Sequence, residues 1–389
     1  MRRTFGLLAA LAVATTGVTL GVEATSAAAS KPIVIGAIGG TTGAYATTGQ
    51  AVVNASKMAV AKINAAGGLL GRKLTLVWGN DDATSTTSAL LFKKFVSEGA
   101  VAMFGSPDTA TVTVSLADKD HIPDLGAIDD GGAAIYAKGP AKAPAAWAWS
   151  TSLNTYAWGQ IVGDYANKSC PTGLAMLHDP TFYGLGGLAG VQQTYKKALK
   201  VNDAISEDWA SGSTQDTVSE IAKVKASGAD CVDVWLTPQD DAVFVKEIHS
   251  LGDHFTVLGN DETCATTDFA KLAGSDATGM YCAELTASYS PNAKVKAFDK
   301  AYKKEFHVTA TAFALVEYDA VNLLATAIKT EKSTSPAKIQ AYLDTHVKDF
   351  HGLSGTLSLT KQKHVTITAP QLTLVKYSVS KHKWVHTSF

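Results

Sequence analysis

The chain has 389 residues, more than one ordinary domain contains, so we expect two domains. Apolar residues make up 46% of the chain and charged residues 18%, and 34 Lys and Arg nearly balance 35 Asp and Glu. This is an ordinary globular composition, and its balanced charge gives no electrostatic reason to expect nucleic acid or an anionic membrane as a partner.

The N-terminus has the pattern of a secretory signal peptide. Arg2 and Arg3 precede an apolar segment at 5–20, and small residues follow up to Ala29. We therefore expect residues 1–29 to be removed on export to the periplasm or the extracellular space, by the general or the twin-arginine route. A membrane anchor is the alternative, but the apolar run is short for a membrane span. No cysteine lies near the cleavage site, so a lipid anchor is not expected.

Segment 31–82 predicts one complete strand–loop–helix–strand unit. A nearly continuous apolar run at 33–38 is typical of a strand buried on both faces of a parallel sheet. Gly39, Gly40 and Gly43 follow it, and apolar residues then recur at helical spacing. Because a parallel crossover is right-handed, the glycine loop falls at the carboxyl end of the strand, where open α/β sheets bind ligands. The loop lacks the lysine and the spacing of a nucleotide-binding loop.

The rest of the chain continues this alternation, which predicts an α/β fold with doubly wound, Rossmann-like parallel sheets. Further strands are expected at 74–78, 100–104, 121–125, 174–177, 205–209, 231–236 and 257–258. Helices are expected at 84–98, around 114–117, and at 156–166, 183–199, 217–225, 242–251, 295–306, 312–328 and 337–346. Near the C-terminus, alternating residues predict an antiparallel hairpin among short strands at 356–359, 366–368 and 372–379.

Four cysteines, Cys170, Cys231, Cys264 and Cys282, allow three pairings in an exported protein. Cys170 and Cys231 each open an apolar run, which suits two adjacent parallel strands bridged at their starts, and Cys264 and Cys282 bracket a local loop. We therefore expect the bridges Cys170–Cys231 and Cys264–Cys282, with four free buried thiols as the alternative. There is no C-x-x-C motif or nearby His pair, so we expect no metal and no other cofactor.

Motifs along the whole mature chain point to one family. The series I-V-I-G-A, T-G-A-Y-A-T-T-G, I-N-A-A-G-G-L-L-G-R-K-L-T-L and N-D-D lies within residues 33–82. Later motifs follow in order: Ile122-Pro123, His178-Asp179 with Tyr183-Gly184, Tyr318-Asp319-Ala320, and Phe350-x-Gly352-x-x-Gly355. Together they resemble the extracytoplasmic solute-binding proteins of branched-chain amino acid ABC transporters, which have the type I periplasmic binding fold.

The resemblance implies two lobes joined by a hinge of several crossing segments. We expect an N-terminal lobe of residues 30–148 and 286–346 and a C-terminal lobe of residues 149–285 and 347–389. Such lobes close on a small solute and deliver it to a membrane permease, without catalysis. We expect a monomer. The alternatives are an exported sensor that signals to a receptor and an exported α/β hydrolase, although no G-x-S-x-G or H-E-x-x-H motif occurs.

The resemblance also implies which residues contact the solute. By position, the expected ligand-binding residues are Tyr45, Thr48, Asp108, Thr109, Asp129 and Asp130 in the first lobe, and Tyr183, Thr237 and Asp261 or Glu262 in the second. In the family, hydroxyls and backbone N–H groups of the first lobe hold the ligand carboxylate, and an acid of the second lobe holds its ammonium group.

The chain departs from the family pattern at Asp108, Asp129 and Asp130. Carboxylates at these positions would repel a ligand carboxylate, and desolvating them together is costly. One hypothesis is therefore a cationic or hydroxyl-rich solute that donates hydrogen bonds to Asp129 or Asp130. The alternative is that these aspartates cap the next helix or face water, which leaves an ordinary amino acid as the ligand.

Overall fold

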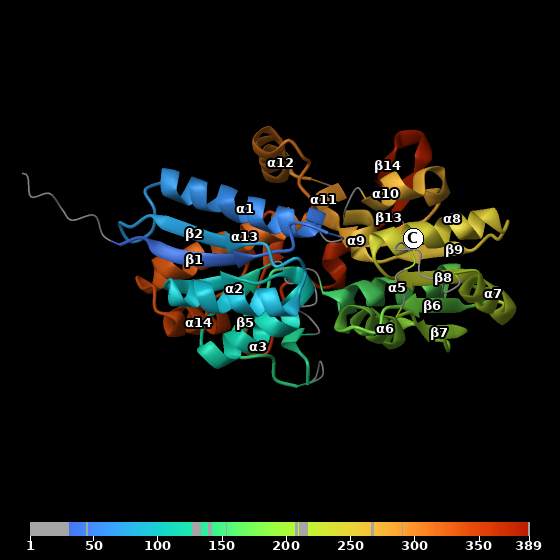
Figure 1. Ribbon diagram of the computed structural model, residues 1–389, viewed down its shortest axis with the longest axis horizontal. Helices are drawn as coiled ribbons and strands as arrows, with labels where there is room; N and C mark the ends of the chain where they lie inside the picture. Colours follow the sequence, from blue (N-terminus) through green and yellow to red (C-terminus); the bar gives the residue numbers. More distant parts are fainter. Residues whose placement is uncertain are drawn as a thin grey trace, which may run out of the picture. The chain divides into compact units, whose positions relative to one another are not determined.

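The computed structural model describes residues 31–43, 46–126, 134–138, 142–152, 154–206, 209, 217–265, 268–289 and 291–387, all within one unit of the chain, Lys31–Phe389. The expected signal peptide, Tyr45, Asp129 and Asp130 lie outside the described residues. The described elements are grouped around two larger sheets (Figure 1).

The strands are β1 (Ile33–Ile38), β2 (Leu74–Gly79), β3 (Ala100–Phe104), β4 (Asp124–Gly126), β5 (Ala148–Ser150), β6 (Leu174–His178), β7 (Val201–Ala204), β8 (Cys231–Trp235), β9 (Thr256–Gly259), β10 (Tyr281–Leu285), β11 (Phe350–His351), β12 (Thr356–Leu357), β13 (Leu372–Ser378) and β14 (Lys383–His386). The α-helices are α1 (Ala46–Ala65), α2 (Ser85–Ser97), α3 (Ala110–Asp120), α5 (Thr155–Ser169), α6 (Phe182–Thr194), α7 (Thr217–Ser227), α8 (Pro238–Ser250), α9 (Asp261–Ala265), α10 (Asp268–Ala273), α11 (Thr286–Tyr289), α12 (Ala293–Phe306), α13 (Ala312–Glu331) and α14 (Pro336–Thr345). Short 3₁₀ turns are η1 (Pro107–Thr109), η3 (Gly274–Ala277), η4 (Ala369–Gln371) and η5 (Val379–Lys381).

The first sheet has the order β2-β1-β3-β4-β5, and all its strand pairs are parallel. Strand β1 is buried on both faces. Ile33 and Ile35 pack in one core cluster with residues of α1 and α13, while Ile38 packs with Phe92 and Phe95 of α2 in another. Helices on both faces of a parallel sheet are the doubly wound arrangement that the alternation of elements predicted.

The second sheet has the order β14-β13-β10-β9-β8-β6-β7. Its strands β6 to β10 pair in parallel, and β13 and β14 extend it in antiparallel pairs. Strand β6 alternates between two cores: Met176 packs in the core that includes α5, and Leu177 packs in the core that includes α7 and α8. The predicted doubly wound α/β fold is therefore confirmed in both sheets.

Three predicted elements were wrong in place or length. Edge strand β7 lies at 201–204 rather than 205–209, because its pairing with β6 and not an apolar run defines it. Helix α6 ends at Thr194 rather than 199, since the side-chain amide of Asn167 donates to Thr194 O at 2.8 Å and accepts from Lys196 N at 2.9 Å. The terminal hairpin pairs β13 with β14, and no strand forms at 366–368.

Both predicted disulfides are present. Cys170 precedes β6 and is joined to Cys231, the first residue of β8, and these two strands are neighbours in the sheet. Cys264 of α9 is joined to Cys282 of β10. All four half-cystines are buried.

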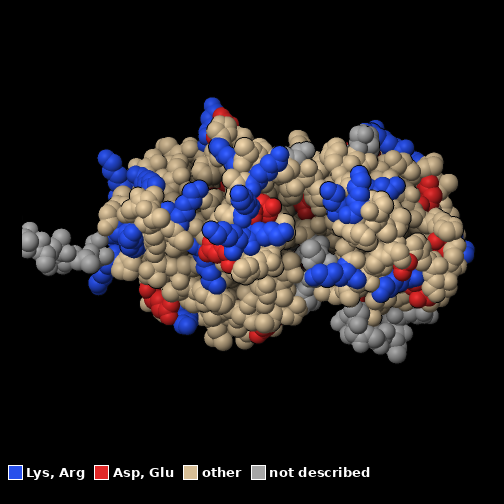
Figure 2. All heavy atoms as spheres, turned by 90° about the horizontal axis from the view of Figure 1, so that it is seen from above, with Lys and Arg blue, Asp and Glu red and all other residues tan. Residues whose placement is uncertain are grey.

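Helix α12 has a basic outer face. Its buried residues are Val295, Phe298 and Tyr302, and five exposed lysines occupy other positions: Lys294, Lys296, Lys300, Lys303 and Lys304. Figure 2 looks down on this side of the molecule and shows many Lys and Arg side chains, with acidic side chains among them. Within the described residues, no helix is long and apolar enough to span a bilayer.

Two family motifs meet where the chain passes between the sheets. Asp319 of α13 accepts hydrogen bonds from Leu353 N (2.7 Å), Ser354 N (2.8 Å) and Ser354 Oγ (2.6 Å). A Cβ on Gly352 would lie 2.2 Å from the Asp319 carboxylate, so this position needs glycine. Nearby, Ser150 N donates to His364 O and Thr366 N donates to Ser150 O, which pairs two further segments.

We predict that Asp319→Ala lowers the free energy of unfolding by about 2–4 kcal/mol, because it leaves two buried backbone N–H groups without an acceptor. Urea unfolding at pH 7 measures this. Lys329→Ala, at an exposed position of the same helix, is the control and should change stability by no more than about 0.5 kcal/mol. Equal stability of the two variants would contradict the prediction.

Candidate functional site

The glycine loop after β1 folds back onto the first turns of α1. A Cβ on Gly49 would lie 2.3 Å from Gly40 O, so only glycine lets helix and loop approach this closely. Thr48, one of the predicted ligand residues, lies beside this contact and is 1% exposed. The loop and the start of α1 therefore form one packed unit.

The N-D-D motif after β2 holds this loop in place. Asn80 Oδ1 accepts from Thr41 N at 2.8 Å, and Asn80 Nδ2 donates to Thr42 Oγ1 at 2.8 Å. Asp82 also accepts a hydrogen bond from Thr42. Sequence reasoning used these residues only as a family signature and missed their role in shaping the loop.

The predicted residues Asp108 and Thr109 lie in η1, directly after the third strand. Thr109 Oγ1 lies 3.0 Å from Asp81 Oδ2 and 2.8 Å from Ser88 Oγ, so its hydroxyl is already engaged within the fold. Asp108 is half-buried, and its carboxylate comes within 3.3 Å of where a Cβ on Gly40 would lie. Asp108 thus borders the glycine loop. Thr109 instead hydrogen-bonds to Asp81, which follows β2, and so holds η1 near the end of that strand.

Asp124 of β4 holds the segment that follows β3. It is fully buried and accepts from Gly105 N at 2.8 Å. Burial raises its pKa to about 6, against the opposing effect of hydrogen bonds from Thr113 and Gly105. A Cβ on Gly105 would lie 2.7 Å from this carboxylate, which explains the glycine after β3.

Tyr183 and Asp261, two of the predicted ligand residues, contact one another beside the second sheet. The Tyr183 hydroxyl donates to Asp261 Oδ1, and the Tyr183 ring packs against Trp235 with 5.3 Å between ring centroids. Asp261 is 1% exposed and begins α9. The pair links α6 to the segment that follows β9.

Thr237, another predicted ligand residue, also has a structural role. It is the N-cap of α8: its Oγ1 accepts from Asp240 N at 3.2 Å and donates to Asp240 Oδ2 at 2.7 Å. The hydroxyl thus both donates and accepts a hydrogen bond in the first turn of the helix.

A hydrogen bond joins the two halves of the predicted site. Thr48 Oγ1 of α1 donates to Glu262 Oε1 of α9 at 3.2 Å, and both residues are buried. Glu262 follows Asp261, so adjacent carboxylates of one short helix contact side chains from α1 and α6. Tyr45, Asp129 and Asp130 stay predictions because they lie outside the described residues.

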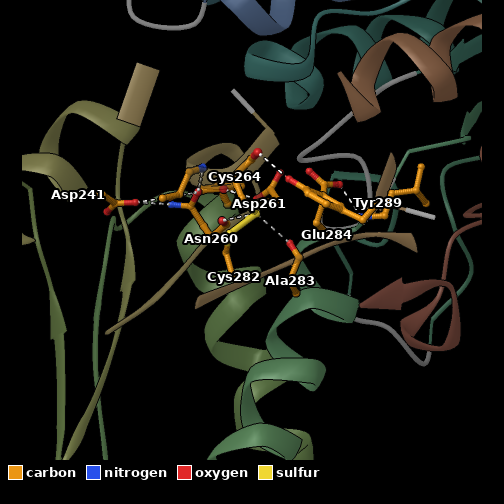
Figure 3. Close-up of a disulfide and its surroundings, with 11 residues drawn as sticks. Asp241, Asn260, Asp261, Cys264, Cys282, Ala283, Glu284 and Tyr289 are labelled. Atoms are coloured by element: carbon orange, nitrogen blue, oxygen red, sulfur yellow. Dashed lines mark hydrogen bonds between the residues drawn. A yellow bond between two sulfur atoms is a disulfide. The ribbon is translucent and has the colours of Figure 1, made fainter. Parts of the chain in front are cut away.

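Sequence reasoning missed Glu284. It lies in β10, is 1% exposed and accepts a hydrogen bond from Leu285 N. Burial raises its pKa to about 8, and the negative charge of Asp261 adds to this effect. Figure 3 shows Glu284 and Asp261 close to one another, near the Cys264–Cys282 disulfide. A lone glutamate in the apolar run Tyr-Cys-Ala-Glu-Leu was the available signal.

The described residues contain no group of three or more His, Cys, Asp or Glu side chains that could hold a metal ion. What the arrangement offers is a set of hydroxyl and carboxyl groups on loops that are tightly fastened to two sheets. These groups are suited to hydrogen-bonding a small polar molecule.

Comparison with known proteins agrees with this arrangement. A model of the periplasmic binding protein family matches residues 32–382. The chain belongs to the periplasmic binding protein family. This confirms the resemblance that the sequence motifs carry. The family is one of solute-binding proteins and not of enzymes, and its members are extracytoplasmic.

Among its relatives is the Leu/Ile/Val-binding protein homolog 3 of Brucella melitensis, 24% identical over 367 residues, which are 92% of this chain and 94% of that protein. A leucine-binding protein of Thermotoga maritima has a similar structure, with a TM-score of 0.79, 16% identity, and coverage of 92% of this chain and 98% of that one. A solute-binding protein of Rhodopseudomonas palustris, solved with 3,4-dihydroxybenzoic acid, has a TM-score of 0.73, 20% identity, and coverage of 92% and 96%.

We predict that Glu284→Gln raises stability relative to the wild type increasingly as the pH rises from 5 to 8. The pKa of Glu284 is higher in the folded state than in the unfolded state. Its protonation therefore stabilises the fold fully below the unfolded-state pKa, and this stabilisation is lost as the pH rises through about 8. The gain at pH 8 over that at pH 5 should be about 1–3 kcal/mol in urea unfolding. A difference that does not vary with pH would contradict the raised pKa.

Proposed function

We propose that this chain is the solute-binding protein of an ABC importer. It captures an amino acid or a related small polar solute between an N-terminal lobe (30–148 and 286–346) and a C-terminal lobe (149–285 and 347–389), and delivers it to a membrane permease. Closure of the lobes by a hinge motion accompanies capture. The Thr48–Glu262 contact carries the proposal, because it brings a side chain of each lobe to one place.

Family membership supports this proposal, and so does the chemistry of α9. Its first two residues, Asp261 and Glu262, are carboxylates that contact Tyr183 of the same lobe and Thr48 of the other. A solute held by these groups would contact both lobes at once and so favour their closed arrangement, since a ligand shifts an equilibrium toward the state that it contacts better.

The solute class is proposed from the residues that depart from the family pattern. Asp108, Asp129 and Asp130 favour a cationic or hydroxyl-rich solute over an ordinary α-amino acid in the usual orientation. Relatives named for leucine, isoleucine and valine, and one solved with a dihydroxybenzoic acid, support a range of small solutes on this fold. Native mass spectrometry of the purified protein would detect a solute retained between the lobes.

We predict that Asp261→Asn weakens binding of the best solute at least tenfold, or about 1.4 kcal/mol, because it removes a buried negative charge from the proposed site. Calorimetry with amino acids, polyamines and hydroxylated acids identifies that solute first. Glu305→Gln, the same chemical change at an exposed position of α12, is the control and should leave affinity unchanged.

Absence of binding to every solute of the panel would count against solute capture. Turnover of a bound compound would instead favour an exported hydrolase. Loss of a cellular response without loss of solute uptake, in a strain that lacks the protein, would favour the sensor alternative.

We predict that Asp129→Asn weakens a cationic or hydroxyl-rich solute by about tenfold, because a charge-assisted hydrogen bond is lost. The same calorimetric series measures it. Tight binding of leucine that is unaffected by Asp129→Asn would reject this solute class and leave capture of an ordinary amino acid in place.

A further inference from the structure

The two disulfides hold different parts of the second sheet. Cys170–Cys231 joins the residue at the end of α5 to the first residue of β8, on the side where β6 and β8 begin. Asp261 and Tyr183 follow the carboxyl ends of β9 and β6, on the other side of the same parallel sheet. Cys264 lies in α9, the helix that begins with Asp261, and its partner Cys282 in β10 pairs with Gly259, the last residue of β9.

Helix α9 is too short to hold its own shape. It has five residues, and a single helical turn is unstable without tertiary contacts. Tyr289 OH of α11 donates to Cys264 O at 3.3 Å, which fixes the end of α9. Thr263 donates to Asp241 of α8, and Asn260 Nδ2 donates to Leu236 O at 2.7 Å (Figure 3). The disulfide adds the one covalent link, from α9 to β10.

We propose that the Cys264–Cys282 disulfide is a positioning device for the solute site. It holds α9 so that Asp261 keeps its contact with Tyr183 and Glu262 keeps its contact with Thr48. It also fixes the distance between α9 and Glu284, which lies two residues beyond Cys282 in β10. This inference rests on the proposed function for its effect on affinity, whereas its effect on α9 can be measured without any solute.

The other disulfide is a matched control. We expect its removal to have the larger effect on stability, and removal of Cys264–Cys282 to have the larger effect on solute binding. Cys170–Cys231 closes a sequence separation of 61 residues and Cys264–Cys282 one of 18. In the chain-entropy account, the longer loop loses more stability when its bridge is removed. If Cys264–Cys282 serves positioning, its removal costs less stability and more solute affinity than removal of Cys170–Cys231.

The test compares the double variants Cys264→Ser/Cys282→Ser and Cys170→Ser/Cys231→Ser with the wild type in the full mature chain. Hydrogen exchange of amides 261–265 is measured without solute, together with thermal unfolding, and calorimetry then uses the solute that the wild type binds. The first variant should exchange these amides at least tenfold faster and bind at least tenfold more weakly. The variant Cys170→Ser/Cys231→Ser should have a lower melting temperature than the first variant, and its solute affinity should be within twofold of that of the wild type.

A third variant, Tyr289→Phe, covers the case in which the first double variant does not fold. It removes the hydrogen bond to Cys264 O and keeps the disulfide, so exchange at 261–265 should rise no more than about threefold. Unchanged exchange in the first double variant, an equal loss of affinity in both double variants, or a tenfold rise in Tyr289→Phe would overturn the inference. If the wild type binds no solute, the proposed function fails, and the exchange measurement alone decides the positioning role.

Discussion

The Asp319 carboxylate joins helix α13 to the loop at 352–354, two segments that are distant in sequence. Helix α13, which carries it, packs in the same core as α1 and β1, and the loop at 352–354 precedes the strands that complete the second sheet. A buried carboxylate is costly, and burial raises the pKa of Asp319 to about 6. Three hydrogen bonds offset that cost only while Gly352 leaves room for the carboxylate. The Y-D-A and F-x-G-x-x-G motifs are thus two halves of one contact.

The same principle applies at the strand ends of the first sheet. Asn80 holds the glycine loop, Asp81 holds Thr109, and Asp124 holds the backbone at Gly105. Of the side chains in these hydrogen bonds, Thr109 is the one that the family resemblance assigned to the ligand. The benefit of these hydrogen bonds is preorganisation, because loops that are already ordered lose less conformational entropy when a solute binds.

The elements that the sequence predicted well are those with their own local signal. Strand β1 follows from its apolar run, and the disulfides follow from Cys170 and Cys231 opening neighbouring strands. The end of α6 could not be predicted, because Asn167 of another helix competes for its last backbone groups. Edge strand β7 likewise exists through pairing with β6 and has no apolar run of its own.

The predicted site residues that the structure describes differ in the contacts that they make. Tyr183 and Asp261 are paired, and Thr48 lies against Glu262, but the hydroxyls of Thr109 and Thr237 are engaged inside the fold. Nothing local to a threonine distinguishes a helix cap from a ligand contact, since both place a hydroxyl near the start of a helix. The partner that decides between them is distant in sequence.

Burial determines the charges of the acidic side chains around α9 and β10. Asp261, Glu262 and Glu284 come from two neighbouring segments, and three negative charges so close together in a buried place would repel one another. With a pKa of about 8, Glu284 is mostly protonated at neutral pH, which relieves this repulsion and leaves it a hydrogen-bond donor. A cation bound nearby would favour its ionised form, whereas an uncharged hydroxyl-rich solute would leave it protonated. The charge of a molecule bound beside Asp261 would therefore determine whether Glu284 carries a negative charge or offers a hydrogen-bond donor.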